Sequence, residues 1–120
     1  MDMADLHGTR ILVAEDEYLL ADDLRGALVD AGAEVLGPVP SVEQAAGLLG
    51  AESVIDFALL DVNLRGEMVF EIADALKERG IPFAFVTGYD RSAIPERYAD
   101  VRIFDKPLRP EHVAGLVSRL

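Results

Sequence analysis

The chain has 120 residues, 51% of them apolar, and a formal net charge of −11. This length suits one domain with its own core, and the lack of cysteine excludes disulfides, thiol nucleophiles and sulfur-ligated metals. The acidic balance disfavours direct binding to nucleic acid. The N-terminus has no signal-peptide pattern, and no apolar segment approaches the ~20 residues of a membrane helix. We therefore expect a cytoplasmic protein.

Short apolar runs alternate with amphipathic segments along the chain. Five runs predict strands, at residues 10–14, 33–37, 57–60, 82–86 and 101–105. Helical apolar spacing predicts a helix ending near residue 31, one beginning at residue 41, one over residues 67–79 and one at the C-terminal end. Residues 91–99 contain Pro95 and a poor apolar stripe, which predicts a short or irregular helix. Residues 1–8 resemble a flexible leader, so residues 9–120 are expected to form the domain.

The helix that begins at residue 41 has a recognisable start. Ser41 followed by Gln44 is typical of a capping box, in which the hydroxyl accepts a hydrogen bond from a backbone amide of the first turn. The apolar residues expected to face inward from this helix are Val42, Ala45, Ala46 and Leu49.

Strands that alternate with helices predict an α/β fold with a doubly wound, five-stranded parallel sheet and helices on both faces. The flavodoxin-like strand order 2-1-3-4-5 fits this length, and it places the first and third strands side by side. Ligand sites in such sheets lie beyond the carboxyl ends of the strands. Polar residues that follow the strands are therefore the candidates for function.

Acidic residues follow the first and third strands. Glu15 and Asp16 come directly after one, and Asp61 ends the other. Such a cluster needs a counter-charge, and Mg²⁺ suits oxygen ligands. Asp16 and Asp61 are the natural direct ligands, with the backbone carbonyl of Asn63 as a third and Glu15 acting through a water. Glu17 is better explained as an acid at a helix start.

The fourth and fifth strands bring a hydroxyl and a cation to the same edge. Thr87 supplies a donor, and Gly88 lets backbone approach a ligand closely. Lys106 offers a charge suited to phosphate, and Pro107 can fix the turn through a cis bond. Together with Asp61, these groups suit the acceptance of a phosphoryl group on a carboxylate.

These residues, in this order, resemble the receiver domain of bacterial two-component response regulators over residues 9–120. The matching stretches are residues 11–17, the Leu60-Asp61 pair, Thr87 and Lys106-Pro107. The resemblance implies Mg²⁺-dependent transfer of a phosphoryl group from a sensor histidine kinase to Asp61. Lys106 and Thr87 would contact that group, and the domain would catalyse its own phosphorylation and dephosphorylation without being a conventional enzyme.

The stretch over residues 82–89 narrows the match. It resembles the "FAT GUY" subgroup, with Val86 where that motif has alanine. Members of this subgroup are often single-domain regulators, and their kinases are commonly of the HWE type. The resemblance thus implies an HWE-type kinase and a downstream protein or phosphotransfer partner. The sequence leaves open whether this is a full single-domain regulator or a piece of a longer chain.

Two departures from ordinary receivers concern the switch and the site loop. Arg65 stands where many receivers have proline, and Ile103 stands where many have the aromatic residue that rotates with the threonine. Phe104 is one residue away and should face the other side of the sheet. We therefore expect the segment from Gly88 to Ala99 to carry the response. Tyr89 is a candidate for shielding the phosphoryl group or for marking the switch.

Three other functions compete with a phosphoacceptor. A flavodoxin-type redox protein shares the fold but needs a donor-rich phosphate loop where this chain has acids. A haloacid-dehalogenase-type phosphatase normally has a second acid where Asn63 stands. A receiver fold could also act as a phosphorylation-independent interaction module. The intact set of Asp16, Asp61, Thr87 and Lys106 argues against this last alternative.

Overall fold

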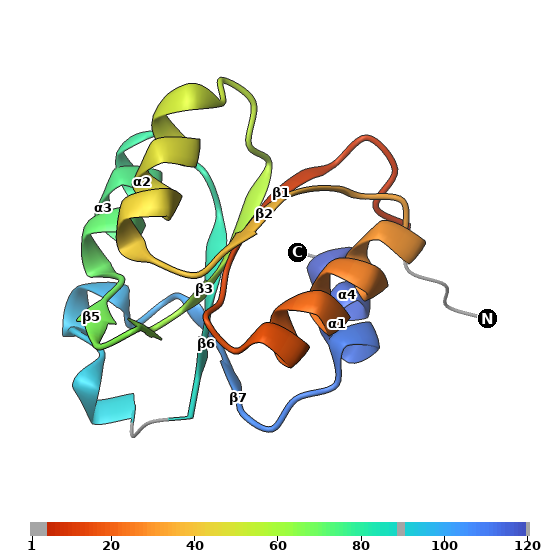
Figure 1. The fold of residues 1–120 in the computed structure, drawn as a ribbon. Helices are drawn as coiled ribbons and strands as arrows, with labels where there is room; N and C mark the ends of the chain where they lie inside the picture. The colour runs from red at the N-terminus through yellow and green to blue at the C-terminus, as the bar shows by residue number, and fades with distance from the viewer. Residues whose placement is uncertain (1–4, 89–90, 120) are drawn as a thin grey trace.

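Five parallel strands form the central sheet of the computed structural model, which describes residues 5–88 and 91–119. Their order is β2-β1-β3-β6-β7, the predicted flavodoxin-like order (Figure 1). The strands are β1 (Arg10–Ala14), β2 (Glu34–Val39), β3 (Phe57–Asp61), β6 (Phe83–Thr87) and β7 (Arg102–Asp105). Both β3 and β6 are buried along their whole length, as expected for central strands of a parallel sheet.

Helices cover both faces of the sheet (Figure 1). One face carries α1 (Tyr18–Asp30) and α4 (Pro110–Val117), and the other carries α2 (Val42–Ala51) and α3 (Phe70–Glu78). Successive strand residues alternate between two apolar cores, so that Leu12 packs toward α2 and α3 while Val13 packs toward α1 and α4. The Ser41 hydroxyl accepts from the Gln44 amide at 3.1 Å, which confirms the predicted cap of α2.

The strand register brings the carboxyl ends of the strands to one edge. Ala14 of β1 pairs with Leu60 of β3, Asp61 pairs with Val86, and Thr87 pairs with Asp105. The residues that follow these positions therefore begin at the same level. Ile103 and Phe104 belong to opposite cores, as predicted from strand alternation.

The structure differs from the sequence prediction at the edge strand and in α2. β2 continues through Pro38 to Val39, because an edge strand can lack one amide donor and the chain absorbs an irregular register between Leu12 and Ala14. The Gly37–Pro38 peptide bond is cis. Ala46 is exposed, whereas it was predicted to face inward, since Val42, Ala45 and Leu49 already fill the buried stripe.

The segment between β3 and α3 also differs from its prediction. The helix expected over residues 67–79 begins only at Phe70, because residues 67 and 68 form strand β5 (Glu67–Met68). β5 pairs antiparallel with β4 (Asn63–Leu64). Residues 91–99 are irregular, as predicted, and contain the short 3₁₀ helices η1 (Arg91–Ala93) and η2 (Glu96–Tyr98).

The described part of the expected leader, residues 5–8, packs on the domain. Leu6 is buried, and its amide donates to the Ala31 carbonyl at 2.7 Å. The apolar side chain of Leu6 is thereby removed from water. In the described part of the chain, every helix is too short or too polar to cross a membrane.

Candidate functional site

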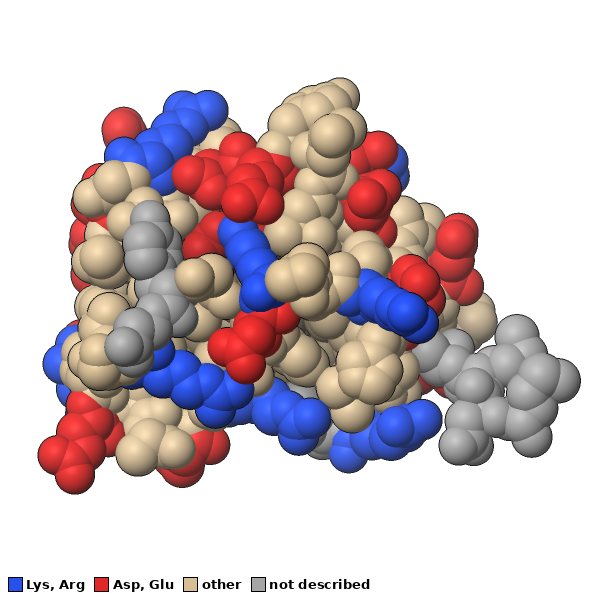
Figure 2. Space-filling view, turned by 90° about the horizontal axis from the view of Figure 1, so that it is seen from below, with Lys and Arg blue, Asp and Glu red and all other residues tan. Residues whose placement is uncertain are grey.

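A polar hollow lies at the carboxyl ends of the strands. Its volume is about 260 Å³, and its lining residues are Asp16, Glu17, Asp61, Asn63, Gly88 and Lys106. Viewed from this end, acidic side chains gather on both sides of a basic one (Figure 2). The hollow thus collects most of the side chains that the sequence singled out, from the ends of β1, β3, β6 and β7.

Lys106 is the cation at the centre of this site. Its Nζ lies 2.8 Å from Asp61 Oδ2, 3.3 Å from Glu15 Oε2 and 3.2 Å from Glu17 Oε1. Burial disfavours the ammonium, but its hydrogen bond to Asp61 and the charges of Asp61 and Glu15 outweigh this and raise the pKa of Lys106. Lys106 therefore stays charged. Glu17, which the sequence assigned to a helix start, is the N-cap of α1 and also pairs with Lys106.

Glu15 is the least satisfied acid in the site. Its Oε2 accepts from the Glu17 amide at 3.0 Å and from Lys106, but its buried Oε1 has no hydrogen-bond partner among the described residues. Burial, together with the neighbouring Asp61 carboxylate, raises the pKa of Glu15 to about 8. The site therefore holds more carboxylate than Lys106 can neutralise.

Asp16 and Asp61 are held from different directions. Asp61 is only 4% exposed, and besides Lys106 it accepts from the Asn63 amide at 3.2 Å. Asp16 lies farther out, and its Oδ2 accepts from the Arg65 amide at 2.9 Å. The Asn63 side chain is used locally, since its Oδ1 accepts from the Gly66 amide at 2.8 Å.

The remaining site candidates lie along the edge formed by β6 and β7. Thr87 is buried, and its carbonyl accepts from the Lys106 amide at 2.9 Å, which ties the two strand ends together. A side chain on Gly88 would meet the Lys106 stem at 3.9 Å. The Lys106–Pro107 bond is cis. Tyr89, proposed as a shield or switch, lies outside the described residues.

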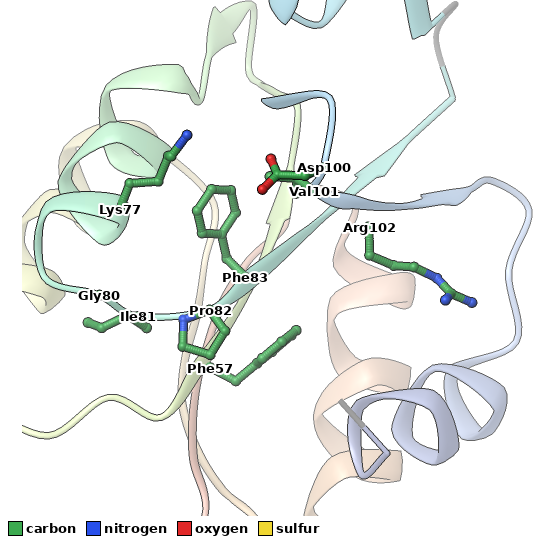
Figure 3. Close-up of a pocket in the computed structure, with 9 residues that line it drawn as sticks. All are labelled: Phe57, Lys77, Gly80, Ile81, Pro82, Phe83, Asp100, Val101 and Arg102. Atoms are coloured by element: carbon green, nitrogen blue, oxygen red, sulfur yellow. The ribbon is translucent and has the colours of Figure 1, made fainter. Parts of the chain in front are cut away.

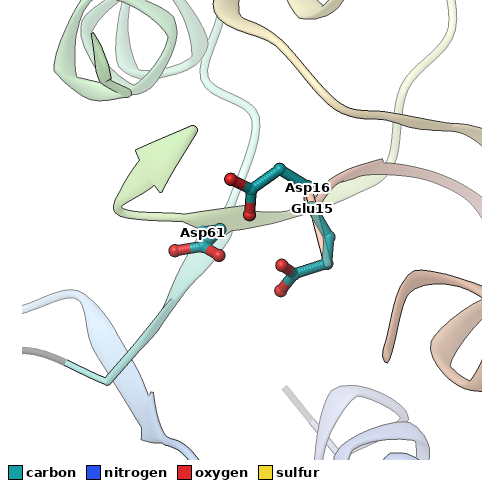
Figure 4. A group of neighbouring side chains, drawn as sticks. All are labelled: Glu15, Asp16 and Asp61. Atoms are coloured by element: carbon teal, nitrogen blue, oxygen red, sulfur yellow. The ribbon is translucent and has the colours of Figure 1, made fainter. Parts of the chain in front are cut away.

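The donor set suits a divalent cation. Glu15, Asp16 and Asp61 each offer an oxygen within 4.8 Å of the other two, with Glu15 and Asp16 approaching from the end of β1 and Asp61 from β3 (Figure 4). All these donors are oxygens, as Mg²⁺ prefers. The unpaired Oε1 of Glu15 is a second sign that the cluster lacks positive charge. The residues present therefore fit Mg²⁺.

A larger hollow, of about 610 Å³, lies at the opposite end of the sheet (Figure 3). Phe57 and Phe83, which begin β3 and β6, contribute to its mainly apolar wall, and Lys77, Asp100 and Arg102 stand around it. Phe57 and Asp61 are the first and last residues of the five-residue strand β3. The usual rise of a strand places them about 13 Å apart. This hollow is therefore separate from the carboxylate site.

Tyr98 anchors the irregular segment between β6 and β7, and sequence reasoning missed it. Its ring is fully buried and stacks on Phe70 at 5.7 Å, with Phe85 edge-on at 5.3 Å. Its hydroxyl donates to the Asp74 carboxylate and to the Phe70 carbonyl. Burial and the Asp74 carboxylate raise the pKa of Tyr98 to about 12. The only sequence signal for this anchor is a tyrosine among polar residues. Apolar periodicity could not identify it, because the segment forms short 3₁₀ turns and not a regular α-helix.

Known proteins resemble this chain in sequence. No family model matches it. It is 28% identical over 114 residues to the phyllosphere-induced regulator PhyR of Methylorubrum extorquens and 35% identical over 114 residues to the sensory transduction protein LytT of Bacillus cereus. Each alignment covers 92% of this chain, but 43% and 45% of those proteins. The chain thus spans less than half the length of these curated relatives.

Two solved structures match this chain over nearly their whole length. SdrG from Sphingomonas melonis Fr1 is 36% identical with a TM-score of 0.78, and the match covers 92% of this chain and 94% of that one. A response regulator receiver protein from Sinorhizobium medicae is 25% identical with a TM-score of 0.79, covering 96% and 95%. The sheet order, the site and these relatives together define a signalling domain. The chain belongs to the receiver domains of response regulators.

Proposed function

We propose that Asp61 accepts a phosphoryl group from the phosphohistidine of a sensor histidine kinase, in a reaction that depends on Mg²⁺. The observation that carries this proposal is the setting of Asp61. It lies at the wall of a polar hollow, 2.8 Å from Lys106 Nζ and within 4.8 Å of two further carboxylates. This arrangement supports a nucleophile whose charge is compensated from several sides.

In the proposed reaction, an Asp61 oxygen forms a bond to phosphorus as the bond from phosphorus to the donor imidazole breaks. The electron pair of that bond leaves with the imidazole. Lys106 then shifts from a carboxylate oxygen to the phosphoryl oxygens, and the Thr87 hydroxyl donates to another of them. Asp16, Asp61, the Asn63 carbonyl and, through a water, Glu15 would hold Mg²⁺, which supplies further neutralisation of the transferred charge.

A partner surface beside the site supports a protein phosphoryl donor. Tyr18 and Leu19 begin α1 directly after Glu17, and they are 81% and 77% exposed. Large apolar side chains so exposed beside a polar hollow suit docking of a partner. We assign this role to a cytoplasmic histidine kinase, of the HWE type that the FAT GUY-like stretch over residues 82–89 suggests. The net charge of −11 disfavours nucleic acid as the direct partner.

We further propose that the segment from Gly88 to Ala99 transmits phosphorylation to a downstream protein. Helical structure in its described part is limited to 3₁₀ turns, and most of its described side chains are exposed. Tyr98 is the buried residue that anchors this part of the segment. Phe85, which contacts the Tyr98 ring, lies two residues before Thr87 on β6. A shift of β6 at Thr87 would therefore reach Tyr98 through one ring contact.

Intact mass spectrometry tests this function. The wild-type chain is incubated with acetyl phosphate and Mg²⁺, with and without EDTA, beside Asp61→Asn. We expect one added phosphoryl group that disappears with EDTA and with the variant. A purified HWE-type kinase with ATP replaces acetyl phosphate in a second arm. If neither donor adds mass while Mg²⁺ binds, the chain acts as a phosphorylation-independent module instead.

A further inference from the structure

Arg65 has an unusual backbone conformation next to the site. Among the described residues it is the only non-glycine with positive φ, at 54°, and Gly66 follows with φ of 86°. Positive φ at both central residues of a two-residue hairpin loop is the mark of a type I′ turn, which strongly prefers asparagine or glycine at the first position. Arginine is thus held there by the surrounding structure rather than by its own preference.

The hairpin that carries this turn is firmly attached to the sheet. Its base is closed by the Val69 amide donating to the Val62 carbonyl at 3.0 Å, and Val62 in turn donates to Val86 of β6 at 3.0 Å. Leu64 is buried in the core, and the Asn63 side chain accepts from the Gly66 amide. The turn therefore stands at a fixed place relative to β3 and β6.

The Arg65 amide is directed at Asp16. It donates to Asp16 Oδ2 at 2.9 Å, although the two residues are 49 positions apart in the sequence. Among the described residues, no other group donates a hydrogen bond to this carboxylate. Lys106 contacts Glu15, Glu17 and Asp61 but makes no ion pair with Asp16. The orientation of Asp16 therefore depends on the hairpin, whereas the other acids are oriented by Lys106.

We propose that the Arg65–Gly66 turn is a positioning element for Asp16, in which the Arg65 amide holds one carboxylate oxygen and leaves the other for a divalent cation. This inference rests on the proposed function, because it assigns Asp16 to the metal. Hydrogen bonds to ligating carboxylates set their direction, and their loss typically weakens metal binding ~10- to 100-fold. The positive φ of Arg65 points its amide at Asp16, which follows β1. This role explains why the chain retains an unfavourable backbone conformation at Arg65.

Isothermal titration calorimetry with Mg²⁺ on the full chain tests the inference. Arg65→Pro removes the amide hydrogen and the positive φ. Many receivers carry proline at this position, but in this chain the change takes away the backbone donor of Asp16, so the variant should bind Mg²⁺ ~10- to 100-fold more weakly than wild type. Arg65→Asn removes the same side-chain charge but keeps the amide and suits the turn better. It should bind at least as tightly as wild type and melt at a higher temperature in EDTA. Ser41→Ala, remote from the hairpin, serves as the unchanged control.

Gly66→Ala provides a second variant if Arg65→Pro does not fold, since alanine at φ 86° displaces the turn while the amide hydrogen remains. It should bind Mg²⁺ more weakly than Arg65→Asn. The inference is overturned if folded Arg65→Pro or Gly66→Ala binds as tightly as Arg65→Asn. It is also overturned if Arg65→Asn loses as much affinity as Arg65→Pro, because the guanidinium would then be the determinant. Absence of binding by wild type would instead overturn the proposed metal site itself.

Discussion

Two polar clusters of this receiver domain differ in how well their charges and their hydrogen-bond partners are matched. In the cluster around Tyr98, the Asp74 carboxylate receives the Tyr98 hydroxyl and two bonds from Arg97, each 3.1 Å long, and the Arg97 guanidinium lies 4.6 Å from the centre of the Tyr98 ring. At the carboxyl ends of the strands, Lys106 faces Glu15, Glu17 and Asp61, and Glu15 Oε1 has no partner among the described residues.

This difference indicates that the cluster around Tyr98 serves stability and that the carboxylate cluster serves function. A cluster whose charges match and whose donors meet acceptors contributes to stability, so its members should lower stability when removed. A cluster with surplus carboxylate destabilises the fold until a cation completes it. Substitutions in the two regions should therefore have opposite effects in metal-free buffer.

The largest effect is expected from Tyr98→Ala. It removes a fully buried ring that contacts Phe70 and Phe85, so the free energy of unfolding in urea should fall by ~3–5 kcal/mol. Tyr98→Phe keeps the ring and should cost only ~1 kcal/mol. A loss below ~1 kcal/mol for Tyr98→Ala would mean that this cluster does not anchor the segment between β6 and β7.

Glu15→Gln should act in the opposite direction. The pKa of Glu15 is about 8 in the folded chain against an ordinary value of 4.5. Between these values the folded chain keeps a proton that the unfolded chain releases, so wild-type stability should fall as pH rises from 4.5 to 8. Glu15→Gln removes this dependence and should be more stable than wild type by ~1–2 kcal/mol at pH 8.

Urea unfolding in EDTA at several pH values between 5 and 8.5 measures this dependence of stability on pH. The pH range follows from the folded and ordinary pKa values of Glu15. The amide can also donate to Asp61, which Glu15 can do only when protonated. Equal pH slopes for the two proteins would contradict a strained carboxylate at position 15.

Ser41→Ala sharpens the comparison from outside both clusters. Loss of the hydroxyl that caps α2 should lower stability by ~1 kcal/mol. Mg²⁺ affinity and phosphorylation should not change, because the cap lies on another part of the fold. A change in Mg²⁺ affinity would show that general destabilisation, and not local charge, governs the site.

Arg97→Leu should have the smallest effect. Its ion pair with Asp74 is about half exposed, so water and salt weaken it, and the Tyr98 hydroxyl still reaches Asp74. A slight loss of stability in low salt should vanish in high salt. A large, salt-independent loss would move Arg97 into the group of essential anchors.

Much of the fold followed from the alternation of apolar runs and helical stripes, since parallel strands leave few arrangements at this length. The grouping of these side chains followed as well, because Asp61 and Thr87 end β3 and β6, Lys106 follows β7, and the topology places these strand ends together. The hairpin over residues 63–68 was missed because Arg65 is a poor residue for positive φ, so only Gly66 signalled a turn. Tertiary contacts to Asp16 override that local preference.

The proposed function depends on completion of the carboxylate site by a divalent cation. The measurement is the urea unfolding free energy of wild type and Asp16→Asn in EDTA and at increasing Mg²⁺. We predict that wild-type stability rises with the logarithm of Mg²⁺ concentration, by ~2.7 kcal/mol at one hundred times the dissociation constant. Asp16→Asn should rise far less. A wild-type stability that does not respond to Mg²⁺ would contradict a divalent-cation site at these carboxylates.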